Sequence, residues 1–73
     1  MTLLINGQKA TKGQEVTTFR GETYILTGWR APGELNGGMN GKVYCKTKEH
    51  YEEKTVWERE FYPSVINGKF VEE

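Results

Sequence analysis

The sequence contains one cysteine, one histidine and no aspartate, and these shortages exclude several kinds of protein. A lone cysteine cannot form an intramolecular disulfide, on which small secreted domains usually depend. We therefore expect a protein of a reducing, cytoplasmic compartment. One cysteine and one histidine also cannot supply the four protein ligands of a structural zinc site. Aspartate is common at helix caps and calcium sites, so its absence argues against those features as well.

Catalytic chemistry finds little support among the remaining reactive side chains. His50 stands between Glu49 and Tyr51 and has no serine or aspartate near it in the sequence. We interpret it as a solvated residue at a polar tip, since a catalytic triad needs three positioned groups. Cys45 alternates with apolar positions, which predicts a buried, inert thiol. The sequence thus predicts no catalytic residue, no metal site and no cofactor, and hence not an enzyme.

Long apolar runs and net charge are also missing. No stretch approaches the ~20 apolar residues of a membrane span, and the run Leu3 to Ile5 is too short for a signal peptide. Ten Lys or Arg offset ten Glu, so no overall field attracts the molecule to phosphates or anionic membranes. The charge is nevertheless uneven, at +4 over residues 1–48 (seven cations, three Glu) and −4 over residues 49–73 (three cations, seven Glu). We expect a soluble protein without membrane partners.

Asn-Gly dipeptides are the most informative feature that is present. Four of them separate short runs of β-branched and aromatic residues, and Asn-Gly supplies the positive φ angles of tight hairpin turns. This pattern predicts an all-β domain of five or six short strands, either a small SH3-like barrel or a strongly bent antiparallel sheet. The predicted strand regions are 3–5, 8–10, 15–19, 23–30, 42–48 and 55–62, with a closing hairpin over 65–71.

Two segments interrupt this strand pattern. Residues 32–41 contain four glycines, which predicts a flexible loop within a single domain of residues 1–73. Residues 49–61 are rich in Glu and Lys, so a short helix there, giving an α+β domain, is the alternative. We favour a returning strand, because the run Thr55 to Trp57 consists of residues typical of strands.

The segment 42–48 alternates most cleanly and carries the main candidate for a binding site. Its outward side is a stripe formed by Lys42, Tyr44, Lys46 and Lys48. Cations interleaved with a ring are typical of surfaces that bind single-stranded nucleic acid, where charges meet phosphates and rings stack on bases. In the competing interpretation, Glu58 and Glu60 on the returning strand lie opposite or diagonal to Tyr44, Lys46 and Lys48 and cancel the field of the lysines. We favour the competing interpretation.

Trp29 and Arg30 end the predicted strand 23–30 beside the glycine-rich loop. Trp and Arg are among the residues that most often dominate protein interfaces, which makes this pair a candidate hot spot. The alternative is that Trp29 belongs to the core, because a small domain needs its large rings for burial. The predicted partner-binding residues are Arg20, Trp29, Arg30, Lys42, Tyr44, Lys46 and Lys48.

Four short segments, taken in order, resemble small proteins encoded by tailed phages. They are Phe19 to Thr23, Gly28 to Pro32, Gly41 to Tyr44 and Glu60 to Val65. The resemblance implies a phage early or accessory gene product that acts in the host cytoplasm, where such proteins bind and redirect host machinery. The chain is also similar in length to a small phage transcription antiterminator that binds host RNA polymerase, although that similarity assigns no contact residue.

The sequence therefore predicts a non-enzymatic, phage-type regulatory protein, expected to be a monomer, that binds a host protein complex. The transcription machinery, meaning RNA polymerase, is the leading partner. A barrel that binds single-stranded nucleic acid through Trp29 and the 42–48 stripe is the alternative, and a minor structural virion protein is a second one. Zero net charge, the uneven charge distribution and the lack of a catalytic constellation support this order.

Overall fold

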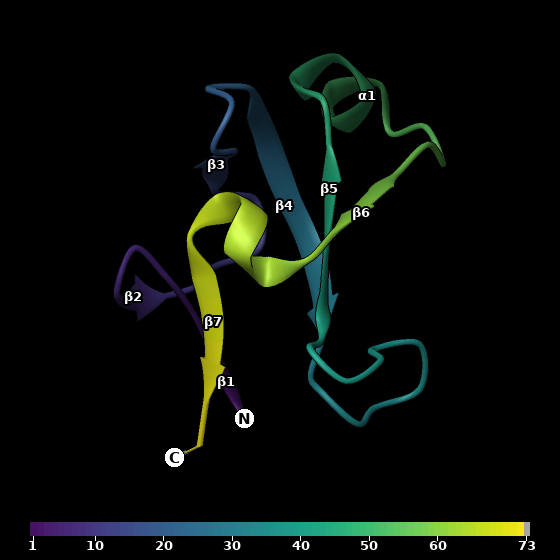
Figure 1. The fold of residues 1–73 in the computed structure, drawn as a ribbon. Coiled ribbons are helices and arrows are strands. Elements are labelled where there is room, and N and C mark those ends of the chain that lie inside the picture. The colour runs from purple at the N-terminus through teal and green to yellow at the C-terminus, as the bar shows by residue number, and fades with distance from the viewer. Residues whose placement is uncertain (73) are drawn as a thin grey trace.

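A computed structural model describes residues 1–72. Within that range the chain forms seven short strands, one α-helix and one 3-10 helix, arranged in two antiparallel sheets (Figure 1). The predicted mainly β class is confirmed, but the described strands form two open sheets and close no barrel. The elements in chain order are β1 Thr2–Ile5, β2 Gln8–Lys9, β3 Glu15–Thr17, β4 Thr23–Arg30, β5 Lys42–Lys46, α1 Lys48–Glu53, β6 Arg59–Phe61, η1 Pro63–Ile66 and β7 Gly68–Val71.

The smaller sheet has the strand order β2-β1-β7. Asn6 and Gly7 have φ angles of 53° and 81° and turn the chain from β1 into β2, as the Asn-Gly pattern predicts. A two-residue loop with this backbone matches the twist of the strands that it joins. β1 also pairs with β7, with Leu3 opposite Phe70, so the first and last strands lie side by side (Figure 1).

The larger sheet has the strand order β3-β4-β5-β6. Its longest strand, β4, has the predicted bounds. The pairing of β4 with β5 shifts between Leu26 and Gly28, so Thr27 is an extra residue on β4. Such a β-bulge redirects the side chains that follow it. Leu26 consequently lies opposite the buried Cys45, whereas Gly28 lies opposite Tyr44 on the outer face.

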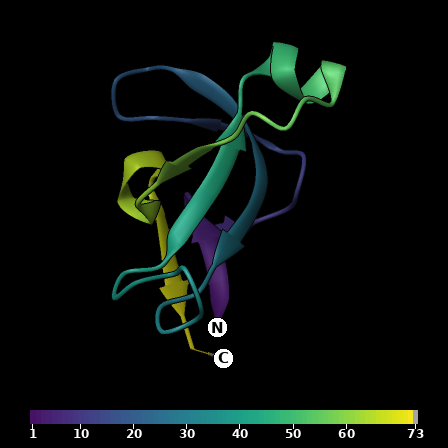
Figure 2. The same cartoon turned by 90° about the vertical axis from the view of Figure 1, so that its right-hand side faces the viewer.

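The core lies between the two sheets, and both contribute to it. Its buried side chains are Leu3, Ile5, Val16, Tyr24, Leu26, Val43, Cys45 and Ile66. Val43 and Cys45 are completely buried, which confirms the predicted inward side of β5. Burial of apolar area contributes about 25 cal/mol per Å², so this cluster holds the sheets together. In Figures 1 and 2, the loop after β4 lies at the same end of the molecule as the termini, and α1 lies at the opposite end.

A helix replaces part of the predicted polar tip. α1 begins directly after β5, because Thr47 Oγ1 accepts a hydrogen bond from the backbone N–H of His50 at 3.2 Å and caps the helix. The strand predicted to reach Lys48 therefore ends at Lys46. The short helix of the alternative prediction is present over residues 49–53, and the returning strand is confined to β6.

The predicted closing hairpin over 65–71 is wrong. Pro63 starts the 3-10 helix η1, a position that suits its fixed φ and its missing N–H. Asn67 ends η1 with a φ of 56°, and its backbone N–H donates to the carbonyls of Pro63 and Ser64. An Asn-Gly pair thus serves here as a helix C-cap rather than as a hairpin turn. β7 pairs instead with the distant strand β1.

Candidate interaction surface

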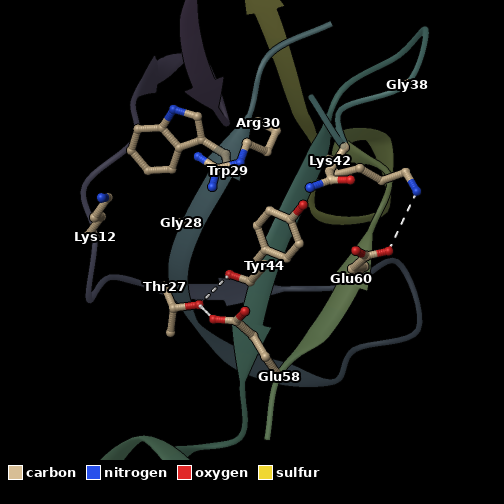
Figure 3. A pocket seen from close by; sticks show the side chains of 11 residues that line it. Lys12, Thr27, Gly28, Trp29, Arg30, Gly38, Lys42, Tyr44, Glu58 and Glu60 are labelled. Carbon is tan, nitrogen blue, oxygen red and sulfur yellow. Dashed lines mark hydrogen bonds and ion pairs between the residues drawn. The ribbon is translucent and has the colours of Figure 1, made fainter. Parts of the chain in front are cut away.

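A groove of about 850 Å³ lies on the outer face of the larger sheet (Figure 3). It crosses β4, β5 and β6 and reaches the loop between β4 and β5, which contributes Asn36 and Gly38. Its charged and aromatic lining residues are Lys12, Trp29, Arg30, Lys42, Tyr44, Glu58 and Glu60. The groove therefore gathers side chains that are up to 48 positions apart in the sequence, from Lys12 to Glu60.

Glycine and threonine shape the floor of the groove. Gly28 lies opposite Tyr44 and has no side chain, so the ring of Tyr44 stands beside open space (Figure 3). The Oγ1 atom of the bulged residue Thr27 is 2.6 Å from Glu58 Oε2 and 3.0 Å from the carbonyl oxygen of Tyr44. A hydroxyl has one proton, so Thr27 donates to one of these oxygens at a time. The bulge thus ties Glu58 to the sheet at one end of the groove.

Trp29 belongs both to the core and to the groove. It is half-buried, packs against the core cluster and also lines the groove. Lys12 Nζ lies 6.0 Å from the centre of its ring, at the outer limit of a cation–π contact. Trp29 therefore packs against the core, as one of the two interpretations predicts, while part of its side chain is accessible at the groove.

Charges of both signs line the groove. Lys42 Nζ lies 3.6 Å from Glu60 Oε1, and the two side chains are 28% and 55% exposed. An ion pair this exposed contributes about 0 to 1 kcal/mol, because water and salt screen it. Lys12 and Arg30 add two further cations, and Glu58 adds a carboxylate. The groove consequently has no strong field of one sign.

The loop between β4 and β5 is folded back on itself. Gly33 N–H donates to the Gly38 carbonyl at 3.0 Å, and Ala31 N–H donates to Glu34 Oε1 at 2.6 Å. These bonds give a segment without regular secondary structure its own internal support. The loop presents two apolar side chains to solvent, Leu35 and Met39, and they are 85% and 94% exposed.

The structure gathers four of the seven predicted binding residues. Trp29, Arg30, Lys42 and Tyr44 all line the groove. Lys46 remains on β5, and its Nζ donates to the Thr55 carbonyl. Lys48 lies on α1 rather than on the strand, because the Thr47 cap ends the alternation. Arg20 lies at the turn between β3 and β4, away from the groove. The predicted stripe of residues 42–48 is therefore wrong as a continuous line of cations.

The expected carboxylate partners are present in part. Glu60 lies opposite Tyr44, as the competing interpretation predicts, but its ion pair is with Lys42 rather than with Lys46 or Lys48. Glu58 instead meets Thr27, a contact that depends on the bulge and has no signal in the sequence. Lys12 was also missed, because it belongs to a turn whose position beside Trp29 follows only from the packing of the sheets.

Reactive side chains lie outside the groove lining. His50 Nδ1 is 2.8 Å from Thr55 Oγ1, and its ring stacks on the half-exposed Trp57 with 4.6 Å between centres. Cys45 is buried as predicted, and burial, followed by the nearby Glu58 carboxylate, raises the pKa of its thiol to about 12.

Residues 1–72 contain no cluster of three or more His, Cys, Asp or Glu that could hold a metal ion. Over the same residues, no helix is long and apolar enough to cross a bilayer.

The groove combines two rings, charges of both signs and an adjoining apolar loop, which are features that protein-binding surfaces share. Comparisons with protein-family models, with curated proteins and with solved structures found no match.

Proposed function

We propose that this chain is a non-enzymatic, phage-type regulatory protein that binds a host protein complex through the groove, with RNA polymerase as the leading partner. The observation that carries the proposal is the exposure of Leu35 and Met39 on the loop that contributes Asn36 and Gly38 to the groove. Both side chains are almost fully exposed, so neither contributes to the core. A partner that covers the loop and the groove together removes this apolar area from water.

Both signs of charge favour a protein over a nucleic acid as the occupant of the groove. Lys and Arg neutralise the phosphates of a nucleic acid, and a nearby carboxylate opposes them. Glu58 and Glu60 lie on the β6 side of the groove, whereas Lys12 and Arg30 lie on the β4 side (Figure 3). A protein surface can complement both signs at once, which also sets its orientation in the groove.

The phage part of the proposal is supported by the sequence resemblance. Three of its four segments, 28–32, 41–44 and 60–65, contribute residues to the groove, and the first of them contains Trp29 and Arg30. Trp and Arg are enriched among the interface residues whose truncation to alanine weakens binding most. The polymerase part is supported by the similarity in length to a small phage antiterminator.

The direct test is binding of the purified full chain to purified bacterial RNA polymerase, measured by sedimentation and by fluorescence anisotropy. We expect a stoichiometric complex that Arg30→Glu weakens by about ten-fold or more, since it reverses a charge in the interface. The double variant Leu35→Ser, Met39→Ser should weaken it as well. Val56→Ser is the matched control, because Val56 is a fully exposed apolar residue that lies between α1 and β6 rather than on the loop between β4 and β5.

Four other outcomes would redirect the proposal. Absence of binding to the polymerase removes it as the target, and failure to retain any stoichiometric protein from a bacterial lysate contradicts host-protein binding altogether. Equal weakening by Arg30→Glu and Val56→Ser contradicts the groove as the binding surface. Self-assembly, or co-sedimentation with phage particles, is the result expected of a structural virion protein.

A further inference from the structure

A second surface runs along β6 and η1, where two adjoining hollows of about 210 and 240 Å³ share Phe61 and Val65. The first hollow extends to the turn between β3 and β4, and the second extends to Tyr62. We call this surface the aromatic belt, and it consists of Phe19, Arg20, Lys42, Arg59, Phe61, Tyr62 and Val65. Lys42 is its only member that also lines the groove.

Each ring of the aromatic belt has a cation beside it. Arg20, Arg59 and Lys42 lie 5.7, 5.3 and 5.4 Å from the ring centres of Phe19, Phe61 and Tyr62, respectively. Phe19 is 76% exposed and Tyr62 is 56% exposed, so both rings offer area to solvent. Phe61 packs edge-on against Tyr24, with 5.2 Å between ring centres, and supports the middle of the aromatic belt.

The turn that presents Phe19 and Arg20 is built before any ligand arrives. Thr18 is buried, and its Oγ1 accepts hydrogen bonds from the backbone N–H groups of Arg20 and Glu22 at 3.3 and 3.2 Å. The Phe19 N–H donates to the Val65 carbonyl at 3.0 Å, which fixes the turn to η1. The backbone that carries Phe19 and Arg20 therefore loses little conformational freedom on binding.

The cations of the aromatic belt stand beside exposed rings, which distinguishes it from the groove, where the charges are balanced in the same way but both rings are half-buried. Three cations line the two hollows, against the carboxylates of Glu22 and Glu60. Glu60 is already paired with Lys42, which leaves Arg20 and Arg59 opposed only by Glu22 among these lining residues. Arg59 Nη1 also donates to the Tyr24 hydroxyl at 3.1 Å, so its guanidinium is held in place at the centre of the row.

We propose that the aromatic belt binds single-stranded nucleic acid. Bases stack on Phe19 and Tyr62, and the phosphates between them meet Arg20, Arg59 and Lys42. This combination of exposed rings and flanking cations is the one by which proteins bind single strands with little sequence preference. A duplex does not fit, because its bases are already stacked on each other and cannot cover the rings. The inference goes beyond binding through the groove, since it uses a different surface and a different class of partner.

The test is fluorescence anisotropy of labelled oligothymidine and oligouridine with the full chain at increasing salt. We expect binding whose logarithm falls with the logarithm of the salt concentration with a slope of about −2, as three phosphate contacts on a single strand predict. Phe19→Ala and Tyr62→Ala should each weaken binding by about ten-fold. Arg20→Ala should reduce the slope by about 0.7.

Matched controls separate the aromatic belt from general charge and from folding. Val56→Ala removes an exposed apolar side chain, and Lys54→Ala removes an exposed cation. Both residues lie outside the aromatic belt, so neither substitution should change the affinity for the oligonucleotides. Circular dichroism checks that each variant is folded. No binding of either single strand at low salt overturns the proposal. Binding that Phe19→Ala and Tyr62→Ala leave unchanged, or equal binding of a duplex or of phosphatidylserine vesicles, overturns it as well. Loss of polymerase binding by Arg30→Glu tests the groove separately.

Discussion

The backbone of Gly41 lies against the ring of Phe70. A Cβ atom added to Gly41 would be 2.5 Å from Phe70 Cε2 and 2.9 Å from the carbonyl oxygen of Arg30, and Gly41 has a φ of 77°. Gly41 precedes β5 of the larger sheet, and Phe70 belongs to β7 of the smaller one. The absence of one side chain thus allows the two sheets to approach each other at this point.

Replacing Gly41 with alanine is therefore expected to lower the free energy of unfolding by about 2 to 4 kcal/mol, because overpacking adds to the cost of a left-handed backbone. Gly33→Ala is the control. Gly33 has a φ of 84° but no atom within 4 Å of an added Cβ, so only the backbone cost of about 1 to 2 kcal/mol applies. Urea unfolding followed by tryptophan fluorescence measures both, and equal losses would contradict the packing argument.

Thr18→Val should lower the free energy of unfolding by about 1 to 2 kcal/mol. Valine keeps the shape of threonine but removes the Oγ1 atom that accepts the N–H groups of Arg20 and Glu22. The neighbouring Thr17→Val is a suitable comparison, because Thr17 is exposed on β3, where valine is at least as favourable as threonine. Chemical denaturation that finds both variants as stable as the parent would mean that Thr18 does not hold the turn.

Stability should fall with rising pH through the titration of Cys45. Burial and then Glu58 raise the pKa of its thiol to about 12 in the folded chain, above the value of about 8.5 in an unfolded one. The stabilising contribution is therefore complete below about pH 8.5 and is lost as the pH rises toward 12, with a slope of about 1.4 kcal/mol per pH unit.

Cys45→Ala isolates this contribution from the lysines and tyrosines that titrate over the same range. The variant should be less stable than the parent at neutral pH, because it leaves a small cavity. The difference between the two should shrink as the pH rises. A difference that stays constant from pH 8.5 upward, measured by denaturant unfolding, would show that the thiol ionises equally in both states.

Lys54→Gly should raise the free energy of unfolding by about 0.5 to 1 kcal/mol. Lys54 ends α1 with a φ of 57°, a left-handed conformation that costs a residue with a Cβ atom more than it costs glycine. The same substitution at Glu52, inside α1, should lower stability by about 1 kcal/mol. Thermal unfolding distinguishes the two, and a loss of stability in both variants would contradict the role of Lys54 as the C-cap.

Much of the local structure is predictable from neighbouring residues. The turn at Asn6-Gly7, the bounds of β4 and the burial of Val43 and Cys45 follow from short patterns that act over a few positions. The helix α1 occupies most of a segment predicted as a polar tip, and Thr47, which the pattern assigns to the preceding strand, caps it instead. Thr47 fits the alternation of a strand equally well, so the pattern alone favours the wrong element.

The candidate site is predictable only in part, because its residues come from segments that packing brings together. Trp29, Arg30, Lys42 and Tyr44 are recognisable from their types and positions beside strand ends. Lys12 and Glu58 are not, since their places depend on the pairing of β4 with β5 and β6. The apolar loop residues Leu35 and Met39 carry a usable signal, which is their presence among glycines without a strand or helix to bury them.

The sequence by itself determined that this chain is mainly β, where most strands run and which side of β5 faces inward. These properties depend on backbone preferences and on a two-residue alternation. Only the tertiary structure decided that β7 pairs with β1, that Asn67 and Gly68 end a helix while Asn6 and Gly7 form a hairpin, and that the sheets stay open. The dipeptide has a left-handed Asn in both places, but Gly7 has a positive φ angle whereas Gly68, the first residue of β7, does not. Its outcome differs because the strand that follows pairs with whichever neighbour buries the shared core.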